Sequence, residues 1–308
     1  MIGVVRISLM TLIMRLTMTA MIDDSSPVKD VRNSTVLALA RCGDDGESFA
    51  VFAAGLAREL GLTLDFIESC KEPPTSLAEC FVIGPAASAD VLDAREARIE
   101  QATAAARAGF DAAVNASGAA ARWTAVTDLF AEDEIWRRAR SAAFLLLSRP
   151  RPSHVAQSLA EHILLRSDTP VLIVPQTPPQ RVTFSTILCA WDGSRQARRA
   201  LRAGMPFLRR AAKVQLVQVD GAVPQGSGAE TLDHIADELA ADGIRTEATL
   251  LKPGAAGIAV TLLDCCARSR SDLLVMGAYR HLRLRELILG GVTRIALERA
   301  VIPILMAH

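Results

Sequence analysis

The stretch that decides the fold is LLVMGAYRHLRLRELILGGVTRIALERAVIPILMAH, which runs from Leu273 to His308. It opens with a short apolar run, Leu273 to Met276, whose length and composition are typical of a buried strand. Residues Val292 to Arg299 have the pattern of a helix, and Ile302 to Met306 form a second apolar run. The order strand, helix, strand predicts two parallel strands joined by a helical crossover.

The residues before this stretch continue the same alternation. Thr186 to Trp191 (TILCAW) is an apolar run that ends at Asp192-Gly193-Ser194. Ser194 is suited to cap a helix. In the helix that follows, one apolar stripe would contain Ala197, Leu201, Met205 and Leu208. The further expected elements are strands at Val214–Val219 and Arg245–Leu251 and helices at Gly228–Asp242 and Ala255–Arg268.

The first half of the chain repeats this βαβαβαβαβ order, so the sequence contains an internal repeat. Its expected strands are Val36–Ala40, Leu62–Ile67, Arg122–Val126, Phe144–Leu147 and Val171–Val174. Its expected helices are one that includes Ala53 to Leu60, then Ala87–Ala108, Glu134–Arg140 and Val155–Leu165. Short strands that alternate with helices predict parallel sheets covered on both faces. The predicted fold class is therefore α/β, with two tandem open five-stranded parallel sheets of Rossmann-like type.

The domain boundaries follow from the same pattern. Residues 34–176 and 183–308 are the two predicted domains, and 177–182 is the linker between them. The surrounding stretch PQTPPQR, residues 175–181, is rich in Pro and Gln and continues neither element.

Residues 1–30 are set apart as a tail. The apolar segment Met1 to Ala20 is interrupted by Arg6 and Arg15, which makes it a poor transmembrane span. A signal peptide is one alternative. We expect a disordered tail, or residues that precede a true start at Met18 or Met21.

Composition excludes several classes of function. The 308 residues are 50% hydrophobic and carry a formal net charge of zero, and there is no long basic run. We therefore expect neither a nucleic-acid nor a membrane partner. The cysteines form no CxxC pair and are expected to be small buried apolar residues in a reducing, cytoplasmic compartment; they are Cys42, Cys70, Cys80, Cys189, Cys265 and Cys266.

The stretch from Leu273 to His308 resembles the C-terminal signature of a universal stress protein domain. The segment ILCAWDGSRQARRAL, residues 187–201, is similar to the first strand and helix of that family. The resemblance covers residues 183–308, whereas 34–176 match only in element order and in the ending VLIVP. It implies a tandem, two-domain member. Because members of the family commonly dimerise through their last strands, it also implies an intramolecular pseudo-dimer through Val171–Val174 and Ile302–Met306. A further homodimer is left open.

The resemblance also points to a nucleotide loop in the second half. ATP-binding members carry Gly-x-x-Gly, nine residues, and then Gly followed by Ser or Thr. Gly277 matches the first glycine and Gly290 the third, whereas Arg280 occupies the second position and Gly291 the Ser/Thr position. Glycines let the backbone approach phosphates, and the free N–H groups that open a helix attract anions.

Four further residues complete the expected cofactor site. Thr293 offers a hydroxyl, and Val292 lies beside it in the same helix start. Asp192 matches the family's adenosine-side acid, and Val219 matches its pocket-wall valine. Arg280 either blocks the pocket or binds phosphate as a cation. The implied cofactor is ATP or another adenine nucleotide, with no metal beyond the Mg²⁺ that accompanies it.

Each of these residues also has a purely structural explanation. The glycines can serve turns and close helix packing, and Asp192 can make a turn and assist a cap. The first half lacks the loop, because its corresponding stretch, Ser148 to His154, contains prolines and no glycine. That half is expected to bind no nucleotide in the family manner.

No catalytic motif accompanies the site. The sequence has no Gly-x-Ser-x-Gly elbow and no Walker A lysine, and its five histidines show no metal-ligand spacing. An adenylate-forming enzyme would need a pyrophosphate loop that Asp192-Gly193-Ser194 does not supply. We predict a non-catalytic regulatory or protective stress-response protein whose second domain binds an adenine nucleotide, with slow ATP hydrolysis left open. The alternative is a nucleotide-independent scaffold that acts through protein contacts.

Overall fold

The computed structural model describes residues 34–41, 46–69, 85–126, 132–149, 168–221, 231–278 and 291–308, which all lie in the compact unit formed by residues 32–308. The tail predicted at 1–30 and the helix predicted at Val155–Leu165 lie outside the described residues.

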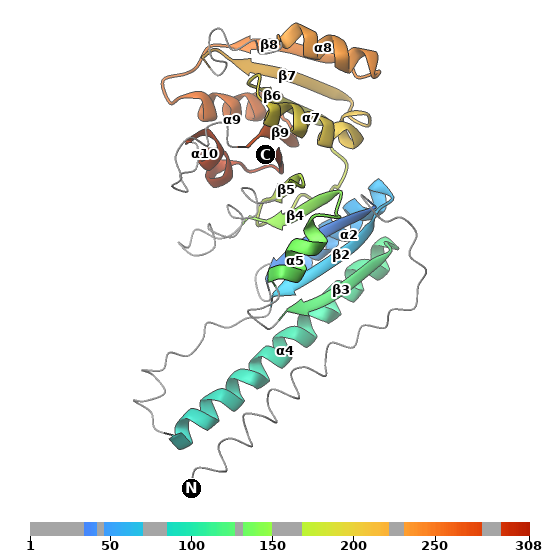
Figure 1. The fold of residues 1–308 in the computed structure, drawn as a ribbon, viewed down its shortest axis with the longest axis vertical. Helices are drawn as coiled ribbons and strands as arrows, with labels where there is room; N and C mark the ends of the chain where they lie inside the picture. Colours follow the sequence, from blue (N-terminus) through green and yellow to red (C-terminus); the bar gives the residue numbers. More distant parts are fainter. Residues whose placement is uncertain are drawn as a thin grey trace. The chain divides into compact units, whose positions relative to one another are not determined.

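The described elements alternate between strands and helices, as the sequence predicts (Figure 1). In the first half they are β1 (Thr35–Arg41), α2 (Gly46–Leu60), β2 (Thr63–Ser69), α4 (Pro85–Ser117), β3 (Ala121–Val126), α5 (Glu132–Ala139), β4 (Phe144–Ser148) and β5 (Val171–Val174). In the second half they are β6 (Thr186–Trp191), α7 (Arg195–Leu208), β7 (Lys213–Val219), α8 (Leu232–Ala241), β8 (Thr246–Leu251), α9 (Ile258–Ser269), β9 (Leu273–Gly277), α10 (Gly291–Arg299) and β10 (Ile304–Ala307).

The strands form a ten-stranded sheet in the order β3-β2-β1-β4-β5-β10-β9-β6-β7-β8. Each half contributes five parallel strands, which confirms the predicted fold class. The two five-stranded sheets are not separate, because β5 and β10 pair antiparallel and join them into one. The predicted pairing of the last strands of the two halves is confirmed.

The junction is short because each of its strands begins after a proline. Pro170 and Pro303 have no N–H to donate, but each offers its carbonyl to the neighbouring strand. The N–H of Leu145 donates to Pro170 O at 2.8 Å, and that of Leu274 donates to Pro303 O at 3.0 Å. The final strand therefore starts at Ile304, two residues later than the predicted start at Ile302.

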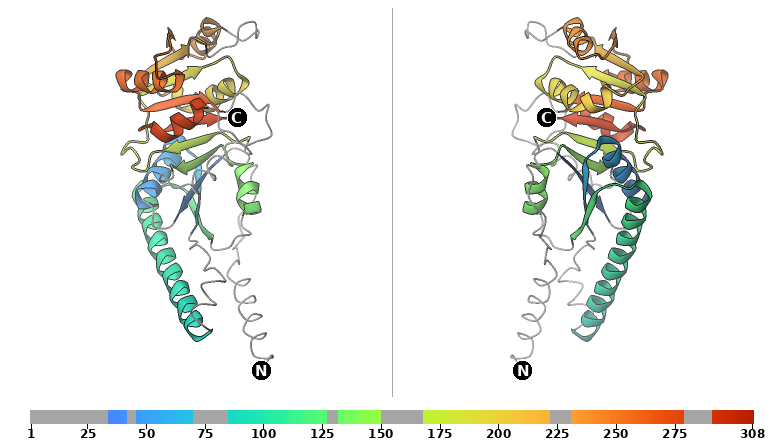
Figure 2. Two further views of the ribbon diagram at one scale, coloured as in Figure 1. Left: turned by 90° about the vertical axis from the view of Figure 1, so that its left-hand side faces the viewer. Right: turned by 90° about the vertical axis from the view of Figure 1, so that its right-hand side faces the viewer.

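Helices cover both faces of the sheet. Apolar side chains of α2, α4, α7 and α8 pack in one core with one face of the strands, and those of α5, α9 and α10 pack in a second core with the other face. Figure 2 shows α4 and α5 on opposite sides of the first half. Strand residues alternate between the two cores, as burial on both faces of a parallel sheet requires.

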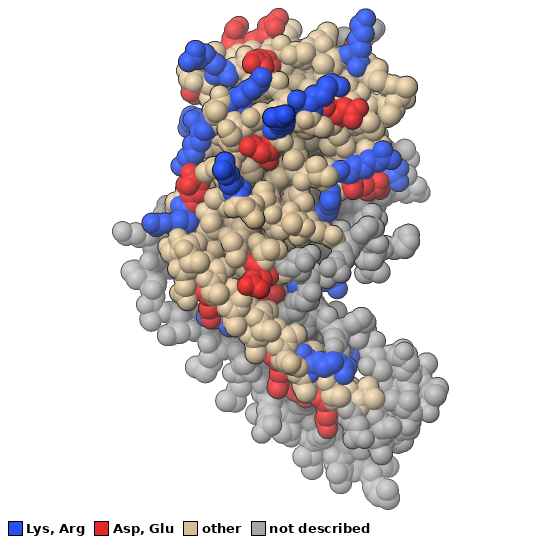
Figure 3. Space-filling view, turned by 180° about the vertical axis from the view of Figure 1, so that it is seen from behind, with Lys and Arg blue, Asp and Glu red and all other residues tan. Residues whose placement is uncertain are grey.

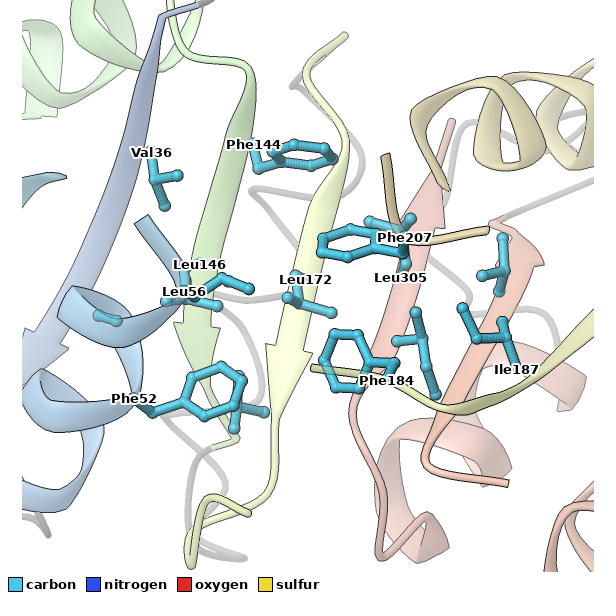
Figure 4. Packing of buried hydrophobic residues seen from close by; sticks show 14 of the residues in the cluster. Val36, Phe52, Leu56, Phe144, Leu146, Leu172, Phe184, Ile187, Phe207 and Leu305 are labelled. Carbon is cyan, nitrogen blue, oxygen red and sulfur yellow. The ribbon is translucent and has the colours of Figure 1, made fainter. Parts of the chain in front are cut away.

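The first core runs without a break across the junction (Figure 4). Leu172 on β5 and Leu305 on β10 are fully buried side by side in the paired strands. Phe207 of α7 lies 5.6 Å from Phe144 of β4 and 5.4 Å from Phe184, measured between ring centroids. Because Phe144 belongs to the first half and Phe207 to the second, the two halves share one packed interior.

Several helix boundaries differ from the predicted ones. The predicted helix at Ala87–Ala108 extends to Ser117, because Phe110 and Ala113 are buried against the sheet. The helix predicted from Ala255 begins at Ile258, after Gly257, whose φ of 87° is a left-handed conformation that glycine adopts readily. The helix predicted from Gly228 is described only from Leu232, where Thr231 caps it.

No helix in the described part of the chain is long and apolar enough to cross a membrane. On the face shown in Figure 3, acidic and basic side chains are interspersed over the described residues. Cys189 and Cys266 are buried, as predicted, and burial raises the pKa of the Cys266 thiol to about 12. Cys265 is only partly buried, and the other three cysteines lie outside the described residues.

Candidate nucleotide site

The strand registers make the two halves comparable residue by residue. Val36 of β1 pairs with Phe144 of β4, and in the second half Ile187 of β6 pairs with Leu273 of β9. Thr35 pairs with Thr63 on the other side, as Thr186 pairs with Lys213. The remaining strand pairs have the same register in both halves, so each strand residue in one half has an equivalent residue in the other.

The described candidate residues of the second half gather at the carboxyl edge of its sheet. Asp192 follows β6, and Val219 and Gly277 end β7 and β9, which flank β6 in the sheet. Strand order reverses between β6 and β9, and such switch points are where open α/β sheets bind ligands. Helix α10 connects two parallel strands, β9 and β10, so it runs back along the sheet and starts at this same edge.

Asp192 makes a tight turn that leads into α7. Its Oδ1 accepts hydrogen bonds from the backbone N–H of Ser194 at 3.0 Å and from the Ser194 hydroxyl at 2.5 Å. Gly193 between them has a φ of 71°, which glycine allows. Ser194 Oγ then accepts from the N–H of Ala197 at 3.0 Å, so the predicted cap is confirmed. Oδ2 of Asp192 accepts no hydrogen bond from a described residue and remains available to a ligand.

Gly277 is required by close packing against α7. A Cβ atom at this position would lie 2.6 Å from the backbone N of Ala197 and 2.9 Å from the backbone C of Gln196. Backbone atoms cannot move aside as the end of a side chain can, so any larger residue would push the first turn of α7 away from β9. Packing alone thus accounts for this glycine.

The first turn of α10 contains the three candidate residues Gly291, Val292 and Thr293. Gly291 is exposed, and no atom lies within 4 Å of the position where its Cβ would be. No described residue therefore demands glycine there, and the space beside the backbone is open with respect to the described part of the chain. Val292 is half-buried, and Thr293 is only 4% exposed.

Of the other three candidates, the structure describes only Val219. Val219 is 1% exposed and belongs to the core shared with α9 and α10, so it lines the floor of this region and not its surface. Arg280 and Gly290 lie outside the described residues. The structure thus places Asp192, Gly277 and the start of α10 at one edge, with Val219 buried beneath.

The first half has different residues at the corresponding positions. The strand registers place Arg41 where the second half has Asp192, and Ser148 where it has Gly277. Ser69 replaces Val219. The expectation that Ser148 begins the stretch corresponding to the loop is confirmed by this register. Sequence alone did not single out Arg41, because the residues after it contain no Asp-Gly-Ser pattern to align.

Glu68, the counterpart of Gln218, is a buried acid that sequence reasoning missed. It is 3% exposed, and the indole N–H of Trp123 donates to its Oε2 at 3.1 Å. A Cβ on Gly46, the first residue of α2, would lie 3.2 Å from its Oε1. Burial raises the pKa of the Glu68 carboxyl, and the hydrogen bond from Trp123 opposes that shift in part. An acid within an apolar strand is the signal that could have found it.

Arg149, the counterpart of Ala278, reaches into the other half of the protein. Its guanidinium donates a hydrogen bond to the backbone carbonyl of Ala300, which directly follows α10. Burial lowers the pKa of this guanidinium, yet an arginine remains charged at physiological pH. The partner lies 151 positions away, so no local sequence pattern could have indicated the contact.

No cluster of metal-ligating side chains occurs within the ranges that the structure describes. Within the described residues, the groups left for a ligand are Oδ2 of Asp192, which accepts no hydrogen bond from them, and the N–H groups of the first turn of α10, which have no partner within the helix. A carboxylate accepts hydrogen bonds from hydroxyl or amino groups, whereas free N–H groups at a helix start bind anions. Together they suit a ligand with a hydrogen-bond donor at one end and a phosphate at the other.

Comparison with solved structures supports the fold. No family model matches the sequence, and no curated protein does. Among solved structures, a universal stress protein from Archaeoglobus fulgidus DSM 4304 is similar with a TM-score of 0.64 and 16% identity, covering 88% of this chain and 97% of that one. A functionally unknown protein from Pseudomonas aeruginosa PAO1 is similar with a TM-score of 0.51 and 13% identity, covering 89% of this chain and 92% of that one.

These likenesses, at low identity, concern architecture. The chain has the fold of a universal stress protein with two five-stranded units in tandem, as the sequence resemblance implied.

Proposed function

We propose that this chain is a tandem universal stress protein, a non-catalytic regulatory or protective protein that binds one adenine nucleotide in its second half. In this proposal the N–H groups that open α10 hold the phosphates, and Oδ2 of Asp192 accepts a hydrogen bond from the nucleoside. ATP, accompanied by Mg²⁺, is the expected ligand. We further propose that the protein acts in the cytoplasm.

One observation carries the proposal: the start of α10 and Asp192 lie at the same sheet edge, beside the switch point. The open space at Gly291 adds to it, since no packing contact with a described residue explains a glycine there. The N–H groups and dipole of a helix start favour anions, and α10 has no acidic residue in its first turn to occupy that position.

A second candidate function is a nucleotide-independent scaffold that acts by protein contacts. It is favoured by Asp192 and Gly277, because a turn and a close packing contact already account for both residues. In that case the carboxyl edge of the second half would have no ligand, and changes at Gly291 would have no effect on any small-molecule affinity.

Calorimetry with ATP and Mg²⁺ distinguishes the two functions. We expect wild type to bind ATP and Gly291→Val to lose at least about 10-fold in affinity, because the new side chain fills the open space beside the helix start. Gly109→Val is the matched control, since Gly109 lies on α4, where a Cβ would make only an ordinary contact of 3.7 Å with Glu47. Absence of ATP binding by wild type, or equal affinity in Gly291→Val, would reject nucleotide binding at this site.

A further inference from the structure

The α10 helix depends for its order on contacts with the rest of the protein. It has only nine residues, and helices of this length have little stability of their own in water. Thr293 and Ala296 are buried, and Val292 and Leu297 pack partly against the second core. These contacts hold one face of the helix but do not fix its ends.

Arg149 fixes the C-terminal end from the first half of the protein. The backbone N–H of Ala300 donates to Ala296 O at 2.9 Å, so Ala300 continues the last turn of the helix. The Arg149 guanidinium donates to the carbonyl of that same residue. A cation here satisfies a carbonyl that the helix leaves without a partner, and it complements the negative end of the helix dipole.

Arg149 is itself held in place by the sheet. It directly follows β4, and its backbone N–H donates to Val174 O of β5 at 2.7 Å. The side chain therefore starts from a fixed point in the first half and crosses the junction between the halves. By strand register, Arg149 in the first half is equivalent to Ala278 in the second half. Ala278 directly follows β9 in the candidate site, whereas Arg149 contacts the end of a helix that belongs to the other half.

We propose that Arg149 is a positioning residue, through which the first half orders α10 and so preorganises the N–H groups at its other end for the nucleotide. This inference rests on the proposed function, because the N-terminal turn of α10 is the proposed phosphate site. It gives the half that lacks the site residues a part in binding. Binding groups that are already ordered pay less entropy when the ligand arrives.

The test combines amide hydrogen exchange of α10 with ATP calorimetry on the full chain. In Arg149→Ala we expect exchange of the hydrogen-bonded amides of α10, those after its first turn, to rise about 10-fold, the effect of losing one hydrogen bond to a charged group. ATP affinity should fall by about the same factor. Arg149→Lys, which retains a charged donor, should recover part of both effects.

Arg199→Ala is the matched control. Arg199 also joins the halves, through an ion pair of 3.6 Å with Asp168, and it donates to the carbonyl of His308 at 2.6 Å. It makes no described contact with α10, so its removal should leave both α10 exchange and ATP affinity unchanged.

Three results would overturn the proposal: unchanged α10 exchange in Arg149→Ala, faster exchange throughout both halves, or equal effects of Arg149→Ala and Arg199→Ala. If wild type binds no ATP, the proposed nucleotide function fails. Exchange without ligand then decides by itself whether Arg149 orders α10.

Discussion

The two halves of this protein have the same strand order and register, but they differ at the carboxyl edge. The second half places Asp192 and Gly277 on the two strands that flank the switch point, whereas the first half has Arg41 and Ser148 there. The buried core determines the common frame, because strand residues face apolar layers on both sides. Asp192, Arg41 and Ser148 lie at strand ends outside that core, so a shared fold does not imply a shared site.

The largest effect should come from the junction that both halves share. Leu305→Ala removes a fully buried side chain from β10, and such a truncation typically costs about 2–5 kcal/mol. We expect urea unfolding to remain a single transition at a lower midpoint, because one core spans both halves. Val301→Ala, at an 82% exposed position nearby, should change the free energy of unfolding by less than about 0.5 kcal/mol.

Two separate transitions in wild type, with only one of them sensitive to Leu305→Ala, would show that the halves fold independently.

The next largest effect is expected at the equivalent ends of β9 and β4, where the two halves should respond differently to the same kind of substitution. Gly277→Ala should destabilise the protein by about 1–3 kcal/mol, because the new Cβ meets the α7 backbone at 2.6 Å. Ser148→Ala, at the equivalent position, should be nearly neutral. The first half tolerates a side chain there because α2 begins at Gly46, five positions after Arg41, whereas α7 begins at Arg195, three positions after Asp192.

Thermal denaturation of the two variants measures this contrast, and equal destabilisation by both would contradict it.

A smaller effect is expected from a variant that distinguishes the structural role of Asp192 from its proposed role in binding. Asp192→Asn keeps an oxygen that can accept from Ser194, so we expect a change in stability of less than about 1 kcal/mol. Loss of the charge should weaken ATP binding by about 10-fold, since hydrogen bonds to charged groups are the stronger ones. Calorimetry and urea unfolding on the same sample provide the two numbers.

Unchanged ATP affinity in Asp192→Asn would restrict this residue to its turn.

The smallest effect should appear in the pH dependence of stability. Burial raises the pKa of Glu68 above its usual 4.5, so the folded state holds that proton more tightly than the unfolded state. The contribution of Glu68 to the free energy of unfolding is fully present below pH 4.5, and it is lost as the pH rises through the pKa of this residue in the folded state. Glu68→Gln introduces glutamine, which the second half has at the equivalent position, Gln218. Its side-chain oxygen can still accept a hydrogen bond from the indole N–H of Trp123.

We therefore expect Glu68→Gln to be more stable than wild type at pH 7 and equally stable near pH 3.5, as measured by urea unfolding at each pH. A variant that is less stable than wild type at pH 7 would contradict this sign.

The sequence predicts the order of elements because strands and helices are encoded in local apolar patterns. It also predicts the Ser194 cap from a short motif, and the family resemblance implies the pairing of the last strands. It does not predict the end of α4, because Gly109, a poor helix former, follows the predicted end at Ala108, whereas burial of Phe110 extends the helix to Ser117. The contact of Arg149 with Ala300 and the reason for Gly277 both depend on segments brought together only by folding.

The central claim is that the protein has one nucleotide site and that it lies in the second half. Photolabelling with an azido derivative of ATP, followed by peptide mapping, tests this claim directly. The account predicts labelled peptides only within residues 183–308, and labelling that excess ATP prevents and that Gly291→Val abolishes. Labelling of peptides within 34–176 that excess ATP also prevents would contradict it.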